Sequence, residues 1–409
     1  MADRRVVVTG IGMVSPLGSD LAAATQRLQA HEHGIRTMPE WDDIGQFAPR
    51  LAATVTIPPA LEIPRREART MGRVAQLAAV ATGIAARDAG LGAEELASGT
   101  VGLAYGSTHG SSAANEQWVR RLLTQNGFLG VSATTYLKFM SHTVAANLAI
   151  HFGIRGRVIP TSAACVSGSL AIGTGFEAIA DGHADVMVCG GAEELHYTHV
   201  AVFDMLDAAS TAFNTTPDAA PRPFDACRDG LVIGEGACTL VLEEYERARK
   251  SGKKIYAEII GYGTNCDGTH VTNPSRDGMR GAMELALRSA GTTPDTIDYV
   301  NAHATATVIG DIAESQATFA IFGDRVPVSS LKGNLGHTLG ACGAIEAAFT
   351  ISMLQGGWIA PTRNLECVDP QCAPLDYVMG APRQARLRRV MSNKFAFGGI
   401  NTSLIFTAA

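Results

Sequence analysis

Short runs of apolar and β-branched residues alternate with longer helical patterns along the whole chain. We expect strands over 6–9, 101–105, 158–161, 186–189 and 239–242, and then over 255–260, 297–301, 326–329, 390–392 and 403–406. Helical periodicity covers 69–88, 279–290 and 312–322. Strands that alternate with helices indicate an α/β fold with largely buried sheets.

Two helical segments, 165–180 and 340–354, carry small or apolar residues on every side. A helix that is apolar all round belongs in the centre of a protein. Each follows a short β run that ends in Thr or Ser, in VIPTSAACVSG and in VPVSSLKGNLGH. This faint repeat predicts two similar halves that meet at two central helices. We place the boundary in the charged stretch 247–254, which gives halves of 1–250 and 251–409.

Composition narrows the class of protein. Of the 409 residues, 46% are hydrophobic and only 18% are charged, so we expect a large core or a buried subunit interface. The net charge of −6 disfavours nucleic acid and anionic membranes as partners. The chain also lacks the ~18 consecutive apolar residues of a membrane span and the apolar run of a signal peptide. We therefore expect a soluble, cytoplasmic protein.

Cysteine and glycine patterns exclude two common kinds of site. The eight cysteines are scattered, and no Cys-x-x-Cys or zinc-type spacing occurs, so we expect neither a disulfide framework nor a bound metal. The segment Thr9 to Gly12 resembles the start of a dinucleotide-binding loop. It lacks the third glycine, and Pro16 interrupts the helix that should follow, so we set nucleotide binding aside.

The strongest chemical motif is Thr161-Ser-Ala-Ala-Cys165-Val-Ser-Gly-Ser169, where a strand ends and a buried helix begins. The partial positive charge and free N–H groups of a helix N-terminus stabilise a thiolate, so Cys165 is a candidate nucleophile. Taken alone, the motif fits equally well a buried cysteine in a small-residue packing helix.

Two further motifs add histidines and a lysine. His303 follows a strand in Asn301-Ala-His303, and Lys332 and His337 flank a glycine-rich loop that enters the second apolar helix. Each motif also has a purely structural explanation. The first would hold a structural histidine, and the second would be a helix-capping turn with a surface lysine. Glu346, inside the apolar helix, needs a partner, and Lys332 is the natural candidate.

A fourth motif, Asn393-Lys-Phe395-Ala-Phe397-Gly-Gly399-Ile-Asn401, precedes the last strand. Its glycines permit close backbone approach, although a tight turn between strands would need them too. In combination, the four motifs, the opening VVVTGIGMVSPLG and the central PRPFDACRDGLVIGEG resemble the elongating β-ketoacyl-acyl-carrier-protein synthases over essentially the whole chain.

This resemblance implies a thiolase-like fold, with two pseudo-duplicated halves in αβαβα layers. It implies that Cys165 takes an acyl chain from acyl carrier protein, with an oxyanion held by the amides of Cys165 and Phe397. His303 and His337 would stabilise the enolate formed when malonyl-carrier protein loses CO2. The product would be a 3-oxoacyl chain on the carrier.

The resemblance also assigns supporting roles. Lys332 would supply positive charge, paired with Glu346 and also with Glu314, near Asp311. Candidate contacts to the carrier's phosphopantetheine arm are Thr305, Thr307 and Thr272, and Phe397 would be a gate beside the nucleophile. The basic patch of Arg65, Arg66 and Arg69 would dock the acidic carrier, although a solvated helix start explains it as well. We expect no bound cofactor, because the substrates arrive on phosphopantetheine.

Departures from the family pattern bear on specificity. Ala304 and Ala306 replace Gly and Ser of the usual His-Gly-Thr-Ser-Thr, and Ala396 replaces the Gly before the gate. A Cβ at 396 restricts the backbone, so we expect the gate to move less, or differently, than in ordinary fatty-acid enzymes. These changes, with the run Arg69-Thr-Met-Gly-Arg, resemble synthases of aryl polyene clusters. That subfamily would imply an unsaturated, aryl-primed chain.

Three hypotheses remain to be separated. The first is a condensing enzyme, as a homodimer or as a heterodimer with a chain-length-factor-like subunit. The second is a non-catalytic partner subunit, which the intact Cys–His–His set disfavours. The third is a hydrolytic acyltransferase, which leaves Lys332 and one histidine unexplained. The resemblance also disfavours two related classes. His337 stands where initiating synthases carry Asn, and the segment Phe395 to Gly399 stands in place of the Cys-x-Gly motif of degradative thiolases.

Overall fold

The computed structural model describes residues 4–409, and its centre is one mixed sheet of eleven strands. The order across the sheet is β12-β10-β9-β14-β15-β8-β1-β7-β6-β4-β5. The strand bounds are β1 Val6–Val14, β4 Val101–Gly106, β5 Val158–Pro160, β6 Val186–Glu193, β7 Gly236–Glu244, β8 Ala257–Cys266, β9 Tyr299–Asn301, β10 Pro327–Ser329, β12 Asp376–Tyr377, β14 Arg389–Phe395 and β15 Ile400–Thr407. Two two-stranded sheets lie outside this sheet, one of β2 Ile35–Thr37 and β3 Leu51–Ala53 and one of β11 Trp358–Ile359 and β13 Arg383–Gln384.

The α-helices lie on the outer faces of the two halves and between the halves. Their bounds are α1 Leu21–Gln29, α2 Arg73–Asp88, α3 Ala93–Leu96, α4 Ser112–Gln125, α5 Ala133–Phe139, α6 Thr143–Phe152, α7 Ser167–Ala180, α8 Tyr197–Asp204, α9 Tyr245–Lys250, α10 Arg276–Ser289, α11 Val308–Phe322, α12 Lys332–Leu335 and α13 Cys342–Gly356. Among the described residues, no helix combines the length and apolar character needed to cross a membrane.

The two parts of the sheet repeat one topology. In the first, β5 and β4 are parallel, β4 and β6 are parallel, and β7 and β1 continue antiparallel. In the second, β10, β9 and β14 are parallel and β15 and β8 continue antiparallel. The faint repeat in the sequence therefore corresponds to a topological repeat. From it we propose the division at residue 250, the last residue of α9.

A pair of glycines marks the repeat at the same point in each half. A Cβ at Gly10 or Gly12 of β1 would lie 2.4 or 2.1 Å from a carbonyl oxygen of α2. A Cβ at Gly261 or Gly263 of β8 would lie 2.5 or 2.2 Å from a carbonyl oxygen of α10. The glycines let each outer helix lie directly on its strand, and β1 runs on through them to Val14.

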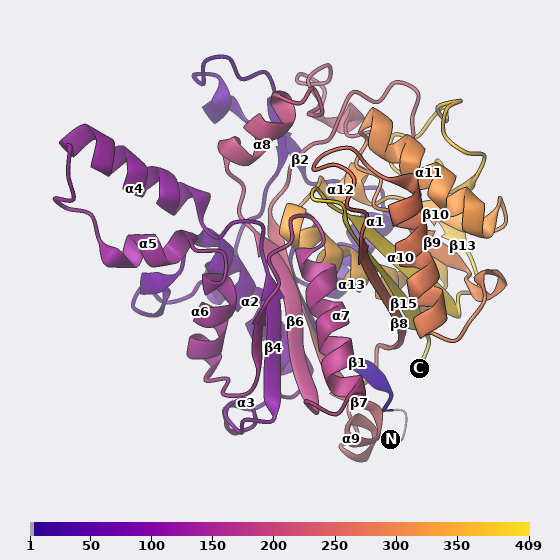
Figure 1. The fold of residues 1–409 in the computed structure, drawn as a ribbon, viewed down its shortest axis with the longest axis horizontal. Helices are drawn as coiled ribbons and strands as arrows, with labels where there is room; N and C mark the ends of the chain where they lie inside the picture. The colour runs from indigo at the N-terminus through magenta and orange to yellow at the C-terminus, as the bar shows by residue number, and fades with distance from the viewer. Residues whose placement is uncertain (1–3) are drawn as a thin grey trace.

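The predicted layered α/β arrangement is confirmed. Helices α2 and α6 cover the outer face of the first half, α10 and α11 cover that of the second, and α7 and α13 pack on each other between the halves (Figure 1). β1 and β8 pair, so the two halves share one continuous sheet. A Cβ at Gly168 of α7 would lie 3.0 Å from Ala344 N of α13, which shows how closely the central helices cross.

Several predicted elements differ in extent. The central helices begin at Ser167 and Cys342, each two residues later than predicted, and most strands are longer than predicted. The arm formed by α4 and α5, which projects from the body in Figure 1, was not predicted. Its helices rest on a small cluster of aromatic rings around Trp118, not on a wide apolar stripe.

Candidate active site

Cys165 lies in the sharp turn between β5 and α7. The preceding residue, Ala164, has a φ of 47°, a left-handed conformation that costs an alanine about 1–2 kcal/mol. The Ser167 hydroxyl holds this turn, since it accepts from Ala163 N at 2.9 Å and donates to Ala164 O at 2.7 Å. The turn directs the Cys165 thiol, which is 7% exposed, toward a cavity.

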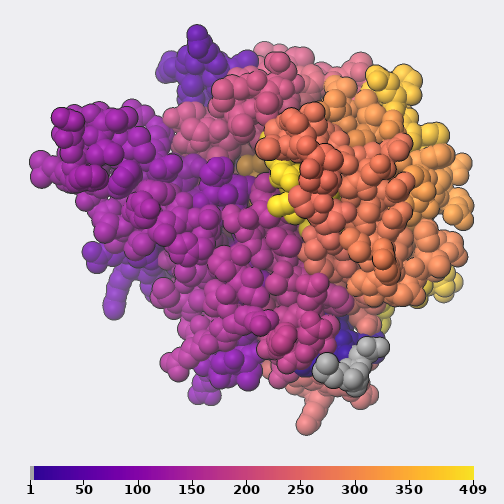
Figure 2. Space-filling view, in the orientation of Figure 1, coloured from indigo at the N-terminus to yellow at the C-terminus, as the bar shows by residue number. Residues whose placement is uncertain are grey.

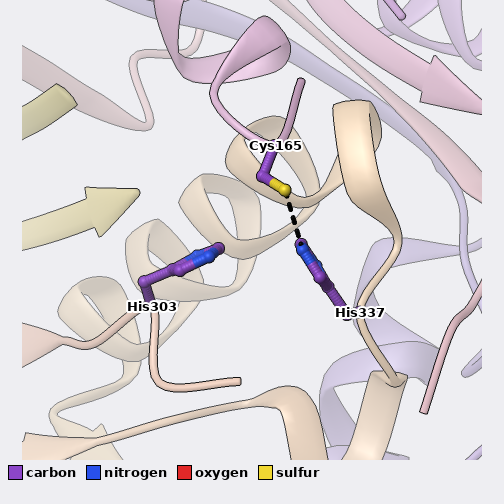
Figure 3. Close-up of side chains that lie close together, drawn as sticks. All are labelled: Cys165, His303 and His337. Atoms are coloured by element: carbon purple, nitrogen blue, oxygen red, sulfur yellow. Dashed lines mark hydrogen bonds between the residues drawn. The ribbon is translucent and has the colours of Figure 1, made fainter. Parts of the chain in front are cut away.

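Two histidines face this thiol from the other half of the molecule. His303 follows β9, and His337 follows α12. His337 Nε2 lies 3.0 Å from Cys165 Sγ, and the two imidazole rings stand nearly perpendicular with centroids 5.1 Å apart (Figure 3). One ligand atom from each of the three side chains lies within 4.8 Å of the other two. The structure thus brings together three residues from distant motifs.

Burial determines the protonation of the three side chains. Burial, and then the positive charge of Lys332, holds the pKa of His303 and of His337 well below 6.5, so both rings are neutral. Burial also raises the pKa of the Cys165 thiol, and the neighbouring Cys342 adds to this shift. The helix N-terminus had suggested a stabilised thiolate, but the desolvation of this site acts in the opposite direction.

A buried ion pair lies beside the histidines. Lys332 and Glu346 are 0% and 1% exposed and their side chains are in direct contact, as the sequence predicted. Burial alone would lower the pKa of Lys332, but Glu346, Cys342 and Glu314 together outweigh it and the pKa is raised. A second buried lysine, Lys394, approaches the other Glu346 oxygen at 3.0 Å. Lys394 was not among the predicted site residues, although a lysine inside the strand VMSNKF was a visible signal.

Glu314 and Asp311 shape the loop that carries His303. Glu314 accepts the amides of His303 and Ala304 at 2.8 and 2.6 Å, and Asp311 accepts those of Ala306 and Phe224 at 3.1 and 2.7 Å. Burial raises the pKa of each carboxyl to about 7. Glu314 therefore binds backbone here and makes no ion pair with Lys332 among residues 4–409.

The cavity in front of Cys165 has a volume of 210 Å³ and is lined by both halves. Its wall includes the predicted pantetheine contacts Thr272, Thr305 and Thr307 and the predicted gate Phe397. In Figure 2 the C-terminal segment, in yellow, reaches the surface between the magenta and orange parts of the chain. The cavity therefore opens where residues of the two halves meet.

The predicted gate, around Phe397, is a tight turn that contacts α8 and the loop after β8. Phe397 packs on Phe203 of α8 with ring centroids 5.3 Å apart, and Gly398 N donates to Val271 O at 2.7 Å. Across residues 4–409, neither the Cys165 nor the Phe397 amide donates to a backbone carbonyl. These two amides are therefore available to a substrate oxygen.

The three predicted docking arginines, Arg65, Arg66 and Arg69, lie outside this cavity. They are exposed around a short helical turn, Glu67–Thr70, which packs on α5. By distance alone, Cys165, His303 and His337 could hold a metal ion. Metal-binding histidines usually donate their second ring N–H to a partner, whereas Nδ1 of both rings is buried and unpartnered here. The lack of a metal stays a prediction.

The comparisons with known proteins all point to one family and together span nearly the whole chain. Residues 3–248 match the family described as "Beta-ketoacyl synthase, N-terminal domain", and residues 256–366 match its C-terminal domain. The chain is 38% identical to 3-oxoacyl-[acyl-carrier-protein] synthase 1 of Haemophilus influenzae, over 98% of both chains. A crystal structure of a β-ketoacyl synthase from Burkholderia phymatum STM815 has 49% identity and a TM-score of 0.95, covering 99% of this chain and 100% of its own. The ishigamide ketosynthase/chain length factor has 32% identity and a TM-score of 0.91, with full coverage of both.

Proposed function

Because this chain belongs to the β-ketoacyl synthase family and is an acyltransferase of the 3-oxoacyl-[acyl-carrier-protein] synthase type, we propose that Cys165 carries the acyl group during its reaction. One observation supports this assignment most strongly. Cys165 Sγ lies 3.0 Å from His337 Nε2, with His303 beside both, on the wall of a single cavity.

In the first half-reaction, Cys165 Sγ attacks the thioester carbonyl of an acyl chain on the carrier. The carrier's phosphopantetheine thiol leaves with the proton of the Cys165 thiol, so no proton is gained or lost. The free amides of Cys165 and Phe397 bind the oxyanion that forms in between. Removing one preorganised donor of this kind typically costs 10²–10³-fold in rate.

In the second half-reaction, the two neutral histidines donate hydrogen bonds from Nε2 to the thioester carbonyl of malonyl-carrier protein. Loss of CO2 leaves an enolate at that oxygen, and its carbon attacks the acyl group on Cys165. The Cys165 sulfur leaves as a thiolate and regains a proton from water. Because burial and Lys332 hold the pKa of both histidines well below 6.5, the rings donate N–H without becoming cations.

Residues around the cavity extend the assignment. Thr272, Thr305 and Thr307 would bind the carrier's phosphopantetheine arm. Arg65, Arg66 and Arg69 would dock the acidic carrier at the surface. Lys332 and Glu346 support the histidines, and Glu314 and Asp311 position the His303 loop.

We propose that the edge strand β5 and the arm form a subunit interface. β5 ends the sheet, and several apolar side chains on and between α4 and α5 are exposed, with Leu123 at 74%, Phe128 at 68% and Leu129 at 83%. Such a surface suggests a partner protein. A second copy of this chain is the first choice, and a chain-length-factor-like subunit is the alternative, as in the ishigamide complex. Sedimentation of the pure chain separates the two. A cytoplasmic location stays a prediction.

One experiment tests the function and identifies the substrate. The chain is incubated with a panel of acyl-carrier proteins of different length and unsaturation, including aryl-primed polyenes, and then with malonyl-carrier protein. Mass spectrometry should detect an acyl adduct on Cys165, absent in Cys165→Ala, and a 3-oxoacyl chain on the carrier. Free acid without extension would favour a hydrolase, and no adduct on any carrier would favour a non-catalytic subunit. Preference for aryl-primed chains would support the aryl polyene assignment.

A further inference from the structure

The chain buries a second lysine beside the catalytic histidines. Lys394, on β14, is 0% exposed. Its Nζ donates to Asn393 O at 2.6 Å and Asn301 Oδ1 at 2.9 Å, and lies 3.0 Å from Glu346 Oε2. Nζ also donates to Ser392 Oγ at 3.3 Å, so three hydrogen-bond acceptors match the three hydrogens of an ammonium group, and Glu346 adds the negative charge.

Lys394 connects the elements that carry the site. Asn301 is the last residue of β9, two residues before His303. Glu346 lies in the central helix α13, and Lys394 itself lies three residues before the gate Phe397. One side chain therefore joins the histidine strand, the gate strand and the central helix.

The charges around Lys394 do not cancel. Glu346 is the single carboxylate in contact with both Lys332 and Lys394 within residues 4–409, so two cations share one anion. The other titratable groups that interact with Lys394 are Glu314, Cys342, His303 and His337. Both carboxylate oxygens of Glu314 accept hydrogen bonds from backbone amides. Burial lowers the pKa of Lys394, Glu346 opposes this shift and Lys332 adds to it. While both lysines are protonated, the site carries excess positive charge in a buried environment, where charges act strongly.

We propose that Lys394 is a positioning residue for the condensation: with Lys332 and Glu346 it forms a buried charge triad that keeps His303 and His337 as uncharged hydrogen-bond donors and stabilises the malonyl enolate. This inference rests on the proposed function. The ammonium of Lys394 need not contact the substrate, because it acts through Glu346, through Asn301 and through its field at the two rings.

The triad affects the two half-reactions differently. Acyl transfer to Cys165 proceeds through an oxyanion held by two backbone amides. Decarboxylation builds negative charge at the oxygen that the histidines hold. Loss of Lys394 should therefore reduce decarboxylation more than acyl transfer. It should also let the histidines take up protons more readily, so that the acidic limb of the decarboxylation profile moves to higher pH.

The test uses the full-length chain with Lys394→Met, which keeps the aliphatic length, and Lys394→Arg, which keeps the charge. Lys253→Met is the matched control. Lys253 also shares a buried glutamate, Glu243, with a second cation, Arg247, but it follows α9 at the opposite end of the sheet from α12 (Figure 1). For each variant we would measure Cys165 acylation and malonyl-carrier decarboxylation from pH 5 to 9.

For Lys394→Met we expect decarboxylation to fall roughly tenfold or more, with acylation reduced several-fold less and the acidic limb moved to higher pH. Lys394→Arg should restore part of the lost rate, and Lys253→Met should leave the ratio and the limb unchanged. Equal losses in both half-reactions with an unmoved limb would overturn the proposal. If the variants do not fold, NMR titration of the histidine rings in the unaltered chain decides, because protonation of His303 or His337 near pH 6.5 contradicts the proposal. An unaltered chain with no acyl adduct would instead refute the proposed function.

Discussion

The Ser167 hydroxyl offers the sharpest test of how the Cys165 turn is built. It is fully buried and bridges Ala163 N and Ala164 O, the two backbone groups beside the nucleophile. Ser167→Ala removes both bonds, and each net hydrogen bond contributes about 1 kcal/mol. Without these two bonds, nothing offsets the cost of about 1–2 kcal/mol of the left-handed backbone conformation of Ala164. We expect the turn to relax and Cys165 Sγ to move away from His337.

Ser169→Ala is the matched control. Ser169 lies in the same helix, is 1% exposed, and also makes two hydrogen bonds, to Val166 O at 3.0 Å and Thr402 Oγ1 at 2.6 Å. Both variants should lower the free energy of unfolding by about 1–3 kcal/mol. Only Ser167→Ala should slow acylation of Cys165, by about 10²-fold if the sulfur shifts by ~1 Å.

Two measurements decide the matter, urea denaturation and the rate of acyl-adduct formation on Cys165. Equal losses of rate in the two variants would refute the reasoning, because they would point to a general effect of destabilising α7. A native rate in Ser167→Ala would also refute it, since the turn would then hold its shape without the hydroxyl.

Three other changes have definite expected outcomes. Ala396→Gly should free the gate, so a bulky iodoacetamide derivative should alkylate Cys165 several-fold faster while iodoacetamide itself reacts at the native rate; a large gate movement in a ligand-bound structure of the native chain would contradict this. Gly191→Ala places a Cβ 2.3 Å from Gly340 O and should cost about 1–3 kcal/mol of unfolding free energy, whereas Gly45→Ala, with nothing within 4 Å, should be neutral in the same denaturation assay. Burial, with His109 and His196, lowers the pKa of His199 to about 3, so the folded state binds fewer protons than the unfolded state below pH 6.5. The contribution of His199 is therefore fully present above pH 6.5 and is lost as the pH falls toward 3, and in urea titrations His199→Gln should lose less stability than the native chain between pH 7 and 4.5.

Local patterns were sufficient to predict the central helices and the four motifs. The small, apolar circumference of α7 and α13 identified them as buried, and the Lys332–Glu346 pair followed from one carboxylate in an apolar helix. These predictions succeeded because each depended on residues close in sequence, or on a charge that had to be matched.

Features that depend on tertiary contacts were missed. Lys394 is buried with its charge matched because Asn301 of β9 and Glu346 of α13, both distant in sequence, contact its ammonium group. The pKa of Cys165 was expected to fall from the helix terminus alone, whereas burial raises it. The two glycines of β1 have the spacing of a dinucleotide-binding loop. They are needed for another reason, because α2 packs so closely on the strand that a Cβ would not fit.

The position of β1 also bears on how the protein is made. The ribosome produces β1 long before its partner strands, because Val6 pairs with Glu244 of β7 on one side and Ile259 of β8 on the other. At 5–20 residues per second, about 12–50 s pass before either partner has been synthesised. During that time nine residues that end up fully buried have no strand to pair with. The emerging chain must therefore shield an apolar segment until β7 has been made, which makes β1 a natural place for a chaperone to bind.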